Sequence, residues 1–417
     1  MGGQREVPWS FDTPRYYMKI LIAHNYYGSA APSGENQVFE AERDVLRRCG
    51  HEVIEFVRYS DEIRSQRHFG AVIGGLSTPW NPWAARALQR MVDGSQPDVV
   101  HVHNTFPLLS PAIFHAISTR VAIILTLHNY RLFCPAATPI RAGRVCTECL
   151  DTQSVFPALR YGCYRNSRLS TLPLAFSVAL HRYLGTWTRH VDAFIALTIF
   201  QRETMVAAGL PAGLVHVKPN FITGNFKPVP WKDRGNYAVF VGRLSVEKGV
   251  RTLISAWRFV NGLPLKILGD GPLRGELEAR VHAQGINAEF LGGVHRDEVL
   301  SIVSRACLQV VPSECFEGFP IVILEAYGSG TPVVASRIGS LAEIVLDGET
   351  GLHFEAGDPV DFAQRVNHLA ERPELAHRMG MKAHETFLEK YTAEKNLELL
   401  MGIYSRAREN CEMRKRH

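Results

Sequence analysis

The sequence contains no long hydrophobic run. No segment reaches the roughly 18 uncharged apolar residues that a membrane-spanning helix requires. The best candidate, LSTLPLAFSVAL at residues 169–180, is shorter and is followed by the polar residues His181 and Arg182. We expect this segment to form either a buried helix or a helix that lies on a membrane surface or faces a lipid.

A secretory signal is also missing. Residues 1–17 are polar and contain no apolar segment of the kind that such signals have. Met18 begins the strand-like run MKILIAHN and resembles a natural start behind an extension. Eight cysteines without a signal favour a reducing compartment. We therefore expect a cytoplasmic protein, with the inner face of the membrane as a further candidate location.

The chain lacks a strong charge of either sign. Its 46 basic and 41 acidic residues give a formal net charge of +5, which is too mild to indicate nucleic-acid binding. No RNA- or DNA-binding motif occurs, and the basic segment RARENCEMRKRH is interpreted as a frayed tail. A nucleic-acid partner is therefore not expected.

Short apolar runs alternate with helix-length segments along the whole chain. Examples are MKILIAH, PDVVHVH and VAIILTLH in the first half, and NYAVFVGR, LPLKILGD and PVVAS in the second. These runs are apolar on both faces, as expected for strands covered by helices. The pattern predicts an α/β protein with two Rossmann-like, doubly wound parallel sheets. Ligands of such sheets bind beyond the carboxyl ends of the strands, which here means the cleft between the domains.

One segment interrupts this pattern. KPNFITGNFKPVPWKDRG is rich in proline, glycine and polar residues, and we place the hinge there. The expected organisation is an N-terminal extension, a first Rossmann-like domain, a second Rossmann-like domain and a C-terminal helix that could cross back to the first domain, at residues 1–17, 18–220, 221–390 and 391–417.

Two cations follow a strand of the second half. In VFVGRLSVEKGV the strand ends near Val241, and Arg243 and Lys248 precede the next helix. Two cations at the carboxyl end of a strand, beside the start of a helix, suit an anion-binding site. The alternative is a basic loop that binds nothing.

Two carboxylates lie eight residues apart in SECFEGFPIVILEAYGSG. Pro320 suits the first position of a helix, so the N–H groups near Gly318 and Phe319 would point from the positive end of that helix toward the same anion. Glu325, about one and a half turns further on, can accept from both hydroxyls of a ribose. Glu317 can accept from hydroxyls on the other side. A diphosphate between cations, with polyols on both acids, describes a nucleotide sugar; the alternative is two solvated acids.

These segments resemble a known family. EGFPIVILEAYGSGTPVVAS is similar to the E-x7-E segment of retaining glycosyltransferases of family 4, which have the two-Rossmann (GT-B) fold. VGRLSVEKGV, LKILGDGPLRGELE, EFLGGVHRDEVLSIVSRA and LDGETGLHFEAGDP fit the same family in order and spacing. The resemblance covers roughly residues 18–404 and is more specific in the second half.

The resemblance implies roles for the residues of the second half. Arg243 and Lys248 would hold the donor diphosphate, Glu325 the ribose, and Glu317 the hydroxyls of the donor sugar. The family usually has glycine where this chain has Pro320, which removes one backbone donor. The remaining backbone groups that could donate to a phosphate belong to Gly318, Phe319 and Ile321.

In the first half the resemblance is weaker and points to two residues. The family often has a Gly-Gly turn near the phosphate and acceptor, where this chain has Ser33-Gly34-Glu35, so only Gly34 is carried over. ILTLHNYRLFCP ends a strand at His128. A histidine at this place contacts the donor sugar near the reacting carbon in relatives, although a lone histidine at a strand end is most often structural.

The implied chemistry is transfer of a hexose from a UDP- or GDP-linked donor to a glycan or lipid-linked acceptor, with retention, in a setting such as bacterial polysaccharide biosynthesis. Transferases of the other fold clamp the diphosphate through a metal and an Asp-x-Asp motif, which does not occur here. We therefore expect no catalytic metal, because cations can stabilise the leaving diphosphate instead. The expected catalytic residues are His128, Glu317, Arg243 and Lys248. A nucleotide-sugar 2-epimerase and an inactive sugar-nucleotide-binding scaffold are the alternatives.

Four of the eight cysteines lie within thirty residues, around a C-x2-C core. Four thiolates in a reducing compartment suit a structural zinc ion. With all four ligand positions filled by sulfur, such an ion would hold the loop in one conformation and would take no part in catalysis. An iron–sulfur cluster, free or redox-active thiols, and disulfides are the alternatives. The insertion at residues 134–163 closely follows His128 and is expected to border the acceptor side of the cleft. The four residues are Cys134, Cys146, Cys149 and Cys163.

Overall fold

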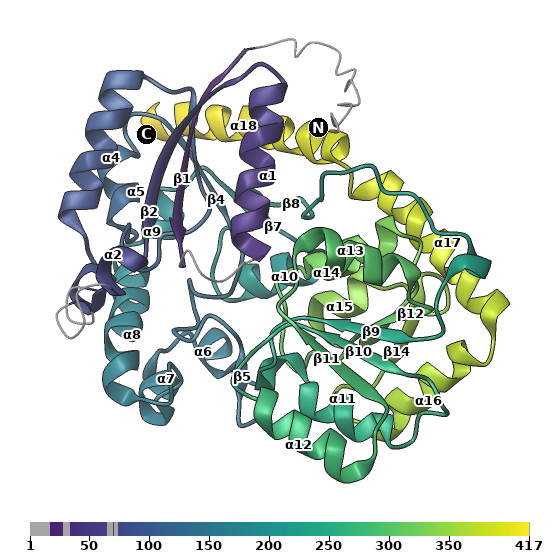
Figure 1. The fold of residues 1–417 in the computed structure, drawn as a ribbon. Helices are drawn as coiled ribbons and strands as arrows, with labels where there is room; N and C mark the ends of the chain where they lie inside the picture. Colours follow the sequence, from purple (N-terminus) through teal and green to yellow (C-terminus); the bar gives the residue numbers. More distant parts are fainter. Residues whose placement is uncertain (1–16, 28–33, 65–69, 71–73, 417) are drawn as a thin grey trace.

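The computed structural model describes residues 17–27, 34–64, 70 and 74–416, which form two α/β domains (Figure 1). The extension at residues 1–16 and Ser33 lie outside the described residues. The first domain is built on a six-stranded parallel sheet with the order β2-β1-β3-β4-β7-β8. Its strands are β1 (Lys19–Tyr26), β2 (Glu52–Tyr59), β3 (Val99–Val102), β4 (Ala122–Thr126), β7 (Ala193–Ala196) and β8 (Val215–Val217).

The second domain has a six-stranded parallel sheet with the order β11-β10-β9-β12-β13-β14. The predicted pair of doubly wound parallel sheets is therefore confirmed. The strands are β9 (Ala238–Val241), β10 (Leu265–Leu268), β11 (Ala288–Gly292), β12 (Leu308–Val311), β13 (Val333–Ser336) and β14 (Gly351–Phe354).

Helices cover both faces of each sheet. In the first domain they are α1 (Gly34–Arg48), α2 (Asp61–Arg64), α4 (Pro82–Ser95), α5 (Ala112–Ile117), α8 (Arg168–Tyr183), α9 (Thr186–Arg189) and α10 (Ile199–Ala207). In the second they are α11 (Val250–Trp257), α12 (Arg274–Gln284), α13 (Arg296–Arg305), α14 (Ile321–Gly328), α15 (Gly339–Ile344), α16 (Pro359–Ala370) and α17 (Pro373–Lys390). Between β4 and α8 the chain forms only a two-residue hairpin, β5 (Ile140–Arg141) and β6 (Arg144–Val145), and the short helices α6 (Glu148–Asp151) and α7 (Phe156–Tyr161).

The alternation of side chains along β1 shows why the strand is apolar throughout. Leu21 and Ala23 join the core under α4 and α5, whereas Ile20 and Ile22 join the core on the opposite face, under α1. Burying both faces removes apolar surface from water on each side of the sheet. The parallel register places the carboxyl ends of β1, β3 and β4 at one edge, because Ala23 pairs with Val102.

The last helix, α18 (Ala393–Arg416), follows α17 and packs on the first domain. Its residues Leu400, Ile403 and Tyr404 are buried in the same cluster as Ile20 and Ile22 of β1. Figure 1 shows α18 in yellow running along the first domain after α17 has passed the second. The chain thus joins the two domains twice, once before β9 and once through α18.

The segment at residues 169–180 has a mixed environment. It lies in α8, which buries one face through residues such as Leu174 and Val178 and exposes apolar side chains on the other. The helix is therefore neither fully buried nor free of the domain. Among the described residues, no helix is long and apolar enough to cross a membrane.

Candidate functional site

The turn after β9 carries both predicted cations of the second domain. Lys248 lies at the end of a 3₁₀ turn just before α11, and its Nζ is 2.6 Å from Glu317 Oε1. Ser313, just beyond β12, donates to the same carboxylate oxygen at 2.7 Å. Burial opposes the charged form of Lys248, but Glu317 outweighs it and raises the pKa of the lysine. The structure therefore brings two predicted residues, Lys248 and Glu317, into one charged pair.

Glycine allows this close approach. Gly249 has φ +64°, and a Cβ there would lie 1.7 Å from the carbonyl oxygen of Pro312. A larger residue would push the turn away from the end of β12 and separate Lys248 from the Glu317 loop.

Arg243 lies on the same turn, two residues beyond β9, and its side chain is exposed. Among the described residues it forms no ion pair. A Cβ on Gly269 would lie 2.0 Å from the carbonyl oxygen of Gly242, so the end of β10 packs directly beneath this turn. Arg243 is consequently a cation that solvent or a ligand can reach.

The loop that holds Glu317 touches the first domain. A Cβ on Gly318 would lie 2.5 Å from the carbonyl oxygen of His128, so the two backbones are in direct contact. A Cβ on Gly34, at the start of α1, would lie 3.7 Å from Ile321 Cγ1. The predicted residues His128, Gly318, Ile321 and Gly34 therefore meet where the carboxyl ends of both sheets face each other.

The start of α14 differs from the prediction in one detail. Pro320 is the residue before the first helical residue, with φ −70° and ψ 113°, so the helix begins at Ile321 rather than at Pro320. The Ile323 N–H donates to the carbonyl of Pro320 at 3.2 Å. Toward other described residues, the N–H groups of Gly318, Phe319 and Ile321 donate no backbone hydrogen bond. These three groups remain able to donate to an anion at the helix start.

Glu325 lies further along α14, and its side chain is 6% exposed. Burial raises its pKa to about 7, against the opposing charge of Arg296. Arg296 is at the first position of α13, and its Nε is 3.7 Å from Glu325 Oε1. The structure thus pairs Glu325 with a cation that the sequence pattern did not single out.

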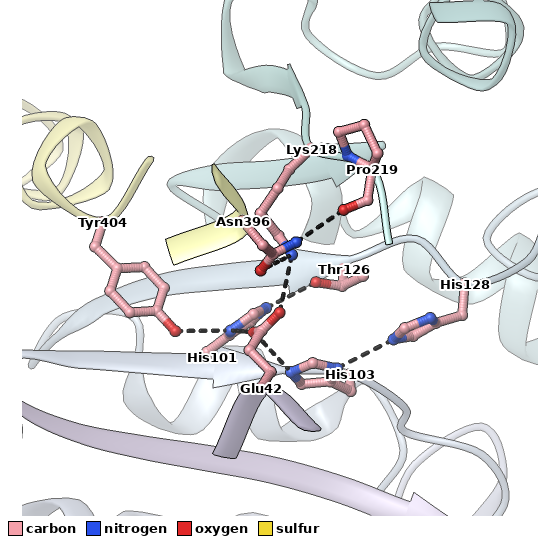
Figure 2. A network of polar contacts seen from close by, with 9 residues as sticks. All are labelled: Glu42, His101, His103, Thr126, His128, Lys218, Pro219, Asn396 and Tyr404. Carbon is pink, nitrogen blue, oxygen red and sulfur yellow. Dashed lines mark hydrogen bonds and ion pairs between the residues drawn. The ribbon is translucent and has the colours of Figure 1, made fainter. Parts of the chain in front are cut away.

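His128, just after β4, belongs to a buried polar network (Figure 2). Its Nε2 is 3.1 Å from Nδ1 of His103, and His103 Nε2 is 3.4 Å from Glu42 Oε1. The same carboxylate oxygen is 3.0 Å from His101 Nδ1. On its other oxygen Glu42 accepts from Lys218 at 2.9 Å. A chain of contacts therefore leads from a buried ion pair to the histidine at the cleft.

The network also anchors the crossing helix. Lys218 Nζ donates to the Asn396 side chain at 3.2 Å, and Asn396 donates to the Pro219 carbonyl at 2.8 Å. Tyr404 of α18 lies 2.9 Å from His101 Nδ1. Figure 2 shows these residues of α18 and the β8 end gathered around Glu42. The position of α18 and the surroundings of His128 are thus fixed by one set of contacts.

The charges in this network follow from burial and pairing. Burial alone would raise the pKa of Glu42, but Lys218, followed by His101 and His103, holds it well below its usual range. Burial lowers the pKa of His103 to about 4 and that of His128 well below its usual value. Glu42 is therefore ionised, and the imidazoles of His103 and His128 are neutral at neutral pH.

This protonation pattern favours one tautomer of His128. Glu42 Oε1 has no hydrogen-bond partner among the described residues, so its contact with His103 Nε2 at 3.4 Å is electrostatic. We infer that the single proton of the neutral His103 is on Nε2, because a lone pair there would face the carboxylate. His103 Nδ1 then accepts, so His128 Nε2 carries its proton and His128 Nδ1 keeps a lone pair that can accept a hydrogen bond.

The sequence interpretation missed Glu42, His101, His103 and Lys218 as parts of the site. His101 and His103 end the run PDVVHVH in the way that His128 ends VAIILTLH, so a histidine at the strand end was a usable signal. Glu42 lies on an ordinary amphipathic helix, and nothing in its local pattern marks it.

A pocket of about 70 Å³ opens beside this network. It lies at the carboxyl ends of β3 and β4 and under α8. Its lining combines apolar side chains with polar groups that can orient a ligand. The lining residues include His103, Phe106, His128, Arg131, Leu174 and Trp187.

Two facing Rossmann-like domains, each built on a six-stranded parallel sheet, are the architecture of the GT-B class. Residues 34–223 match the model "Glycosyltransferase Family 4", and residues 222–386 match "Glycosyl transferases group 1". The chain therefore belongs to the family 4 type of glycosyltransferase, and the predicted family is confirmed.

Three comparisons show how far the similarity extends. The chain is 36% identical over 169 residues to an uncharacterized glycosyltransferase of Methanocaldococcus jannaschii, covering 40% of this chain and 46% of that protein. It is 33% identical over 168 residues to the D-rhamnosyltransferase WbpZ of Pseudomonas aeruginosa, covering 39% and 44%. These matches span less than half the length of both relatives. The structure of Anabaena HepE in complex with UDP and glucose aligns with a TM-score of 0.64 at 18% identity, covering 93% of this chain and 100% of that one. This similarity shows that the two proteins share a fold.

Proposed function

We propose that this protein is a retaining glycosyltransferase that transfers a hexose from a UDP- or GDP-linked donor to a glycan or lipid-linked acceptor. The observation that supports this most is the meeting of the Lys248–Glu317 pair with His128, across the contact between Gly318 and the His128 carbonyl. A protein of the same fold, HepE, has been solved with UDP and glucose in complex.

In this proposal, positive groups of the chain hold the donor diphosphate. Arg243 and Lys248 provide two cations, and the N–H groups at the start of α14 provide dipolar donors. As the bond between the anomeric carbon and the diphosphate breaks, negative charge grows on the leaving group. Fixed cations stabilise that charge more than the charge of the intact donor, which lowers the barrier.

The sugar would lie between the two domains. Glu317 accepts hydrogen bonds from its hydroxyls, and His128 accepts another through its unprotonated Nδ1. The acceptor hydroxyl attacks the anomeric carbon from the face that the diphosphate leaves, and a donor phosphate oxygen takes the proton. The new bond therefore keeps the configuration of the donor, and the nucleoside diphosphate departs with the proton.

The acceptor would enter from the side of α8 and the pocket beside His128. The outer face of α8 exposes apolar side chains that a lipid-linked acceptor or a membrane surface could cover. We infer a peripheral location at the inner face of the membrane, in a setting such as bacterial polysaccharide assembly. The exposed residues are Leu169, Leu172, Phe176 and Tyr183.

Donor binding is expected to weaken as the pH falls below about 7. Burial raises the pKa of Glu325 to about 7, and only the ionised carboxylate accepts from both ribose hydroxyls. Below that pH the free protein must lose a proton to bind, so affinity falls by up to about tenfold per pH unit. Calorimetric titration with a nucleotide sugar, whose diphosphate has no titrating group in this range, measures the effect. In the Glu325→Gln variant this pH dependence should vanish, and an unchanged slope there would contradict the assignment.

The transferase is separated from its alternatives by the acceptor dependence of donor consumption. Without an acceptor, we expect the donor to remain intact. With an acceptor, we expect nucleoside diphosphate and glycosylated product to form in equal amounts. A 2-epimerase would convert the donor alone, and a scaffold would bind the donor without turnover. Either result would overturn the proposal.

A further inference from the structure

The four clustered cysteines line one cavity. They come from different local structures: Cys134 from the turns after β4, Cys146 from just after β6, Cys149 from α6, and Cys163 from just beyond α7. Pro157 and Ala158 complete part of the wall. All eight cysteines of the chain are free, so none of the four is consumed in a disulfide.

The C-x2-C pair sits on a compact hairpin. β5 and β6 pair antiparallel across a turn formed by Ala142 and Gly143, which have φ 50° and φ 75°. Cys146 is the first residue after β6, and its N–H donates to the Pro139 carbonyl at 3.1 Å. The chain then enters α6, which carries Cys149. The two sulfurs of the pair are thus presented at the junction of a hairpin and a helix, in a spacing that structural zinc sites use.

The Cys134 thiol lies 4.0 Å from the carbonyl oxygen of Thr138, which also lines the cavity. Arg141 also lines the cavity and is paired with Glu148.

The insertion contains little regular secondary structure. It has two-residue strands and helices of four and six residues. Of the seven non-glycine residues with positive φ in the described chain, five lie in the insertion or just after it, between residues 137 and 166. Such conformations persist when surrounding structure constrains them, and here Leu150 of α6 is buried in the core of the first domain. The five are Ala137, Ala142, Gln153, Arg165 and Asn166.

We propose that Cys134, Cys146, Cys149 and Cys163 bind one zinc ion that fixes the 134–163 insertion to the first domain. Four sulfur ligands complete a tetrahedral shell and leave no open position, so the ion is structural. Zn–S bonds of about 2.3 Å would draw the sulfurs closer together than the cavity now holds them. A tighter cluster occurs at Glu42, His101 and His103, where the ligand atoms lie within 4.8 Å of one another. There Lys218 already provides the cation.

The site has a consequence for the cleft, which rests on the proposed function. Arg131 and Leu132, directly before the insertion, line the pocket beside His128. Arg131 lies 4.1 Å over the Phe106 ring and donates to the Pro135 carbonyl at 3.3 Å. Fixing the insertion therefore fixes one wall of that pocket, and loss of the ion should raise KM for the acceptor more than KM for the donor.

The test measures metal directly in the full-length protein, purified without added metal or a metal-affinity step. Elemental analysis is expected to give close to one zinc per chain. The Cys146→Ser/Cys149→Ser variant should lose the zinc, whereas Cys307→Ser should keep it. Cys307 is a matched control, because it is as buried as Cys134, at 8% exposure, and lies in the second domain. Wild type with zinc far below one per chain, or a Cys307→Ser variant that loses it, would overturn the proposal.

Cobalt exchange distinguishes the ligands even if the double variant fails to fold. Wild type loaded with Co²⁺ is expected to show the intense thiolate-to-metal absorption of a four-sulfur tetrahedral site. If the purified protein is brown and contains iron, the cysteines bind an iron–sulfur cluster and the zinc proposal is wrong. If mass spectrometry shows the mass loss of two disulfides among these cysteines, they bind no metal. None of these readouts depends on glycosyl transfer, so failure of the transferase assignment would leave the metal result intact.

Discussion

Replacing Lys248 with alanine is expected to lower kcat/KM for the donor by about 10²-fold, which corresponds to about 2.7 kcal/mol. Charge-assisted hydrogen bonds contribute about 1.5–3 kcal/mol each, and the transition state carries more negative charge on the diphosphate than the donor does. The variant also leaves the Glu317 carboxylate without its partner at 2.6 Å. Arg243→Ala, on the same turn, should produce a loss of similar size.

A matched control is Lys382→Ala. Lys382 is also paired with a glutamate, Glu385, at 2.8 Å, but the pair is exposed on α17, away from the cleft. Its loss should change kcat/KM by less than about twofold, since exposed pairs contribute little. Steady-state kinetics with melting temperatures for each variant separate catalysis from folding. Wild-type kinetics in both Arg243→Ala and Lys248→Ala would refute the assigned diphosphate site.

The Glu42→Gln variant is expected to lose about 3–5 kcal/mol of folding stability. Lys218 is 1% exposed, and without the carboxylate 2.9 Å away its ammonium group becomes an uncompensated buried charge. The change also removes the anchor of His103, so the tautomer of His128 is no longer fixed. We expect kcat to fall together with stability. Denaturant unfolding followed by fluorescence measures the stability term.

Two comparisons make this result specific to the buried pair. Asp44→Asn, on the same helix, weakens a partly exposed ion pair with Arg43 at 2.8 Å and should cost under about 1 kcal/mol. Glu42→Gln/Lys218→Met removes both charges and should recover much of the loss, because the unpaired charge is the main cost. A double variant as unstable as the single one would contradict this account.

The same pair should make folding sensitive to acid. Because the pKa of Glu42 is held well below its usual range in the folded protein, its contribution is complete above the ordinary carboxyl pKa of about 4.3. The contribution is then lost as the pH falls toward the lower folded-state value. The low pKa of His103, about 4, acts in the same direction, since the unfolded chain takes up that proton first.

The inner strands of the sheets, such as β4 and β7, were predictable because both of their faces are buried, which leaves a continuous apolar run. The edge strands β2 and β11 are only partly buried but were still predicted. The exceptions are β8 (VHV) and β14 (GLHF), which were missed because three or four residues with a histidine give no clear pattern. Arg243 was found because parallel sheets place all carboxyl strand ends at one edge, whereas His128 was singled out by the family resemblance at such a strand end. The position of a residue just after a strand therefore marks it for the cleft.

The buried network was not predictable from local pattern. Glu42 and Lys218 are 176 residues apart, and Asn396 is 178 residues from Lys218. Lys218 is held beside Glu42 by Asn396 of α18. The sequence around Glu42 therefore does not indicate whether its side chain faces solvent or a buried lysine, because that depends on where α18 packs. The pairing of Glu325 with Arg296 has the same origin, because α13 and α14 meet only in the folded domain.

The central claim is that two cations and a helix start hold a diphosphate. It is tested most directly by comparing the affinities of a nucleoside diphosphate and the same nucleoside, in wild type and in Arg243→Ala/Lys248→Ala. We predict that wild type prefers the diphosphate by about 10²-fold or more, from two charge-assisted contacts. The double variant should lose most of this preference while its affinity for the nucleoside stays the same. An equal preference in both proteins would show that the diphosphate is held elsewhere.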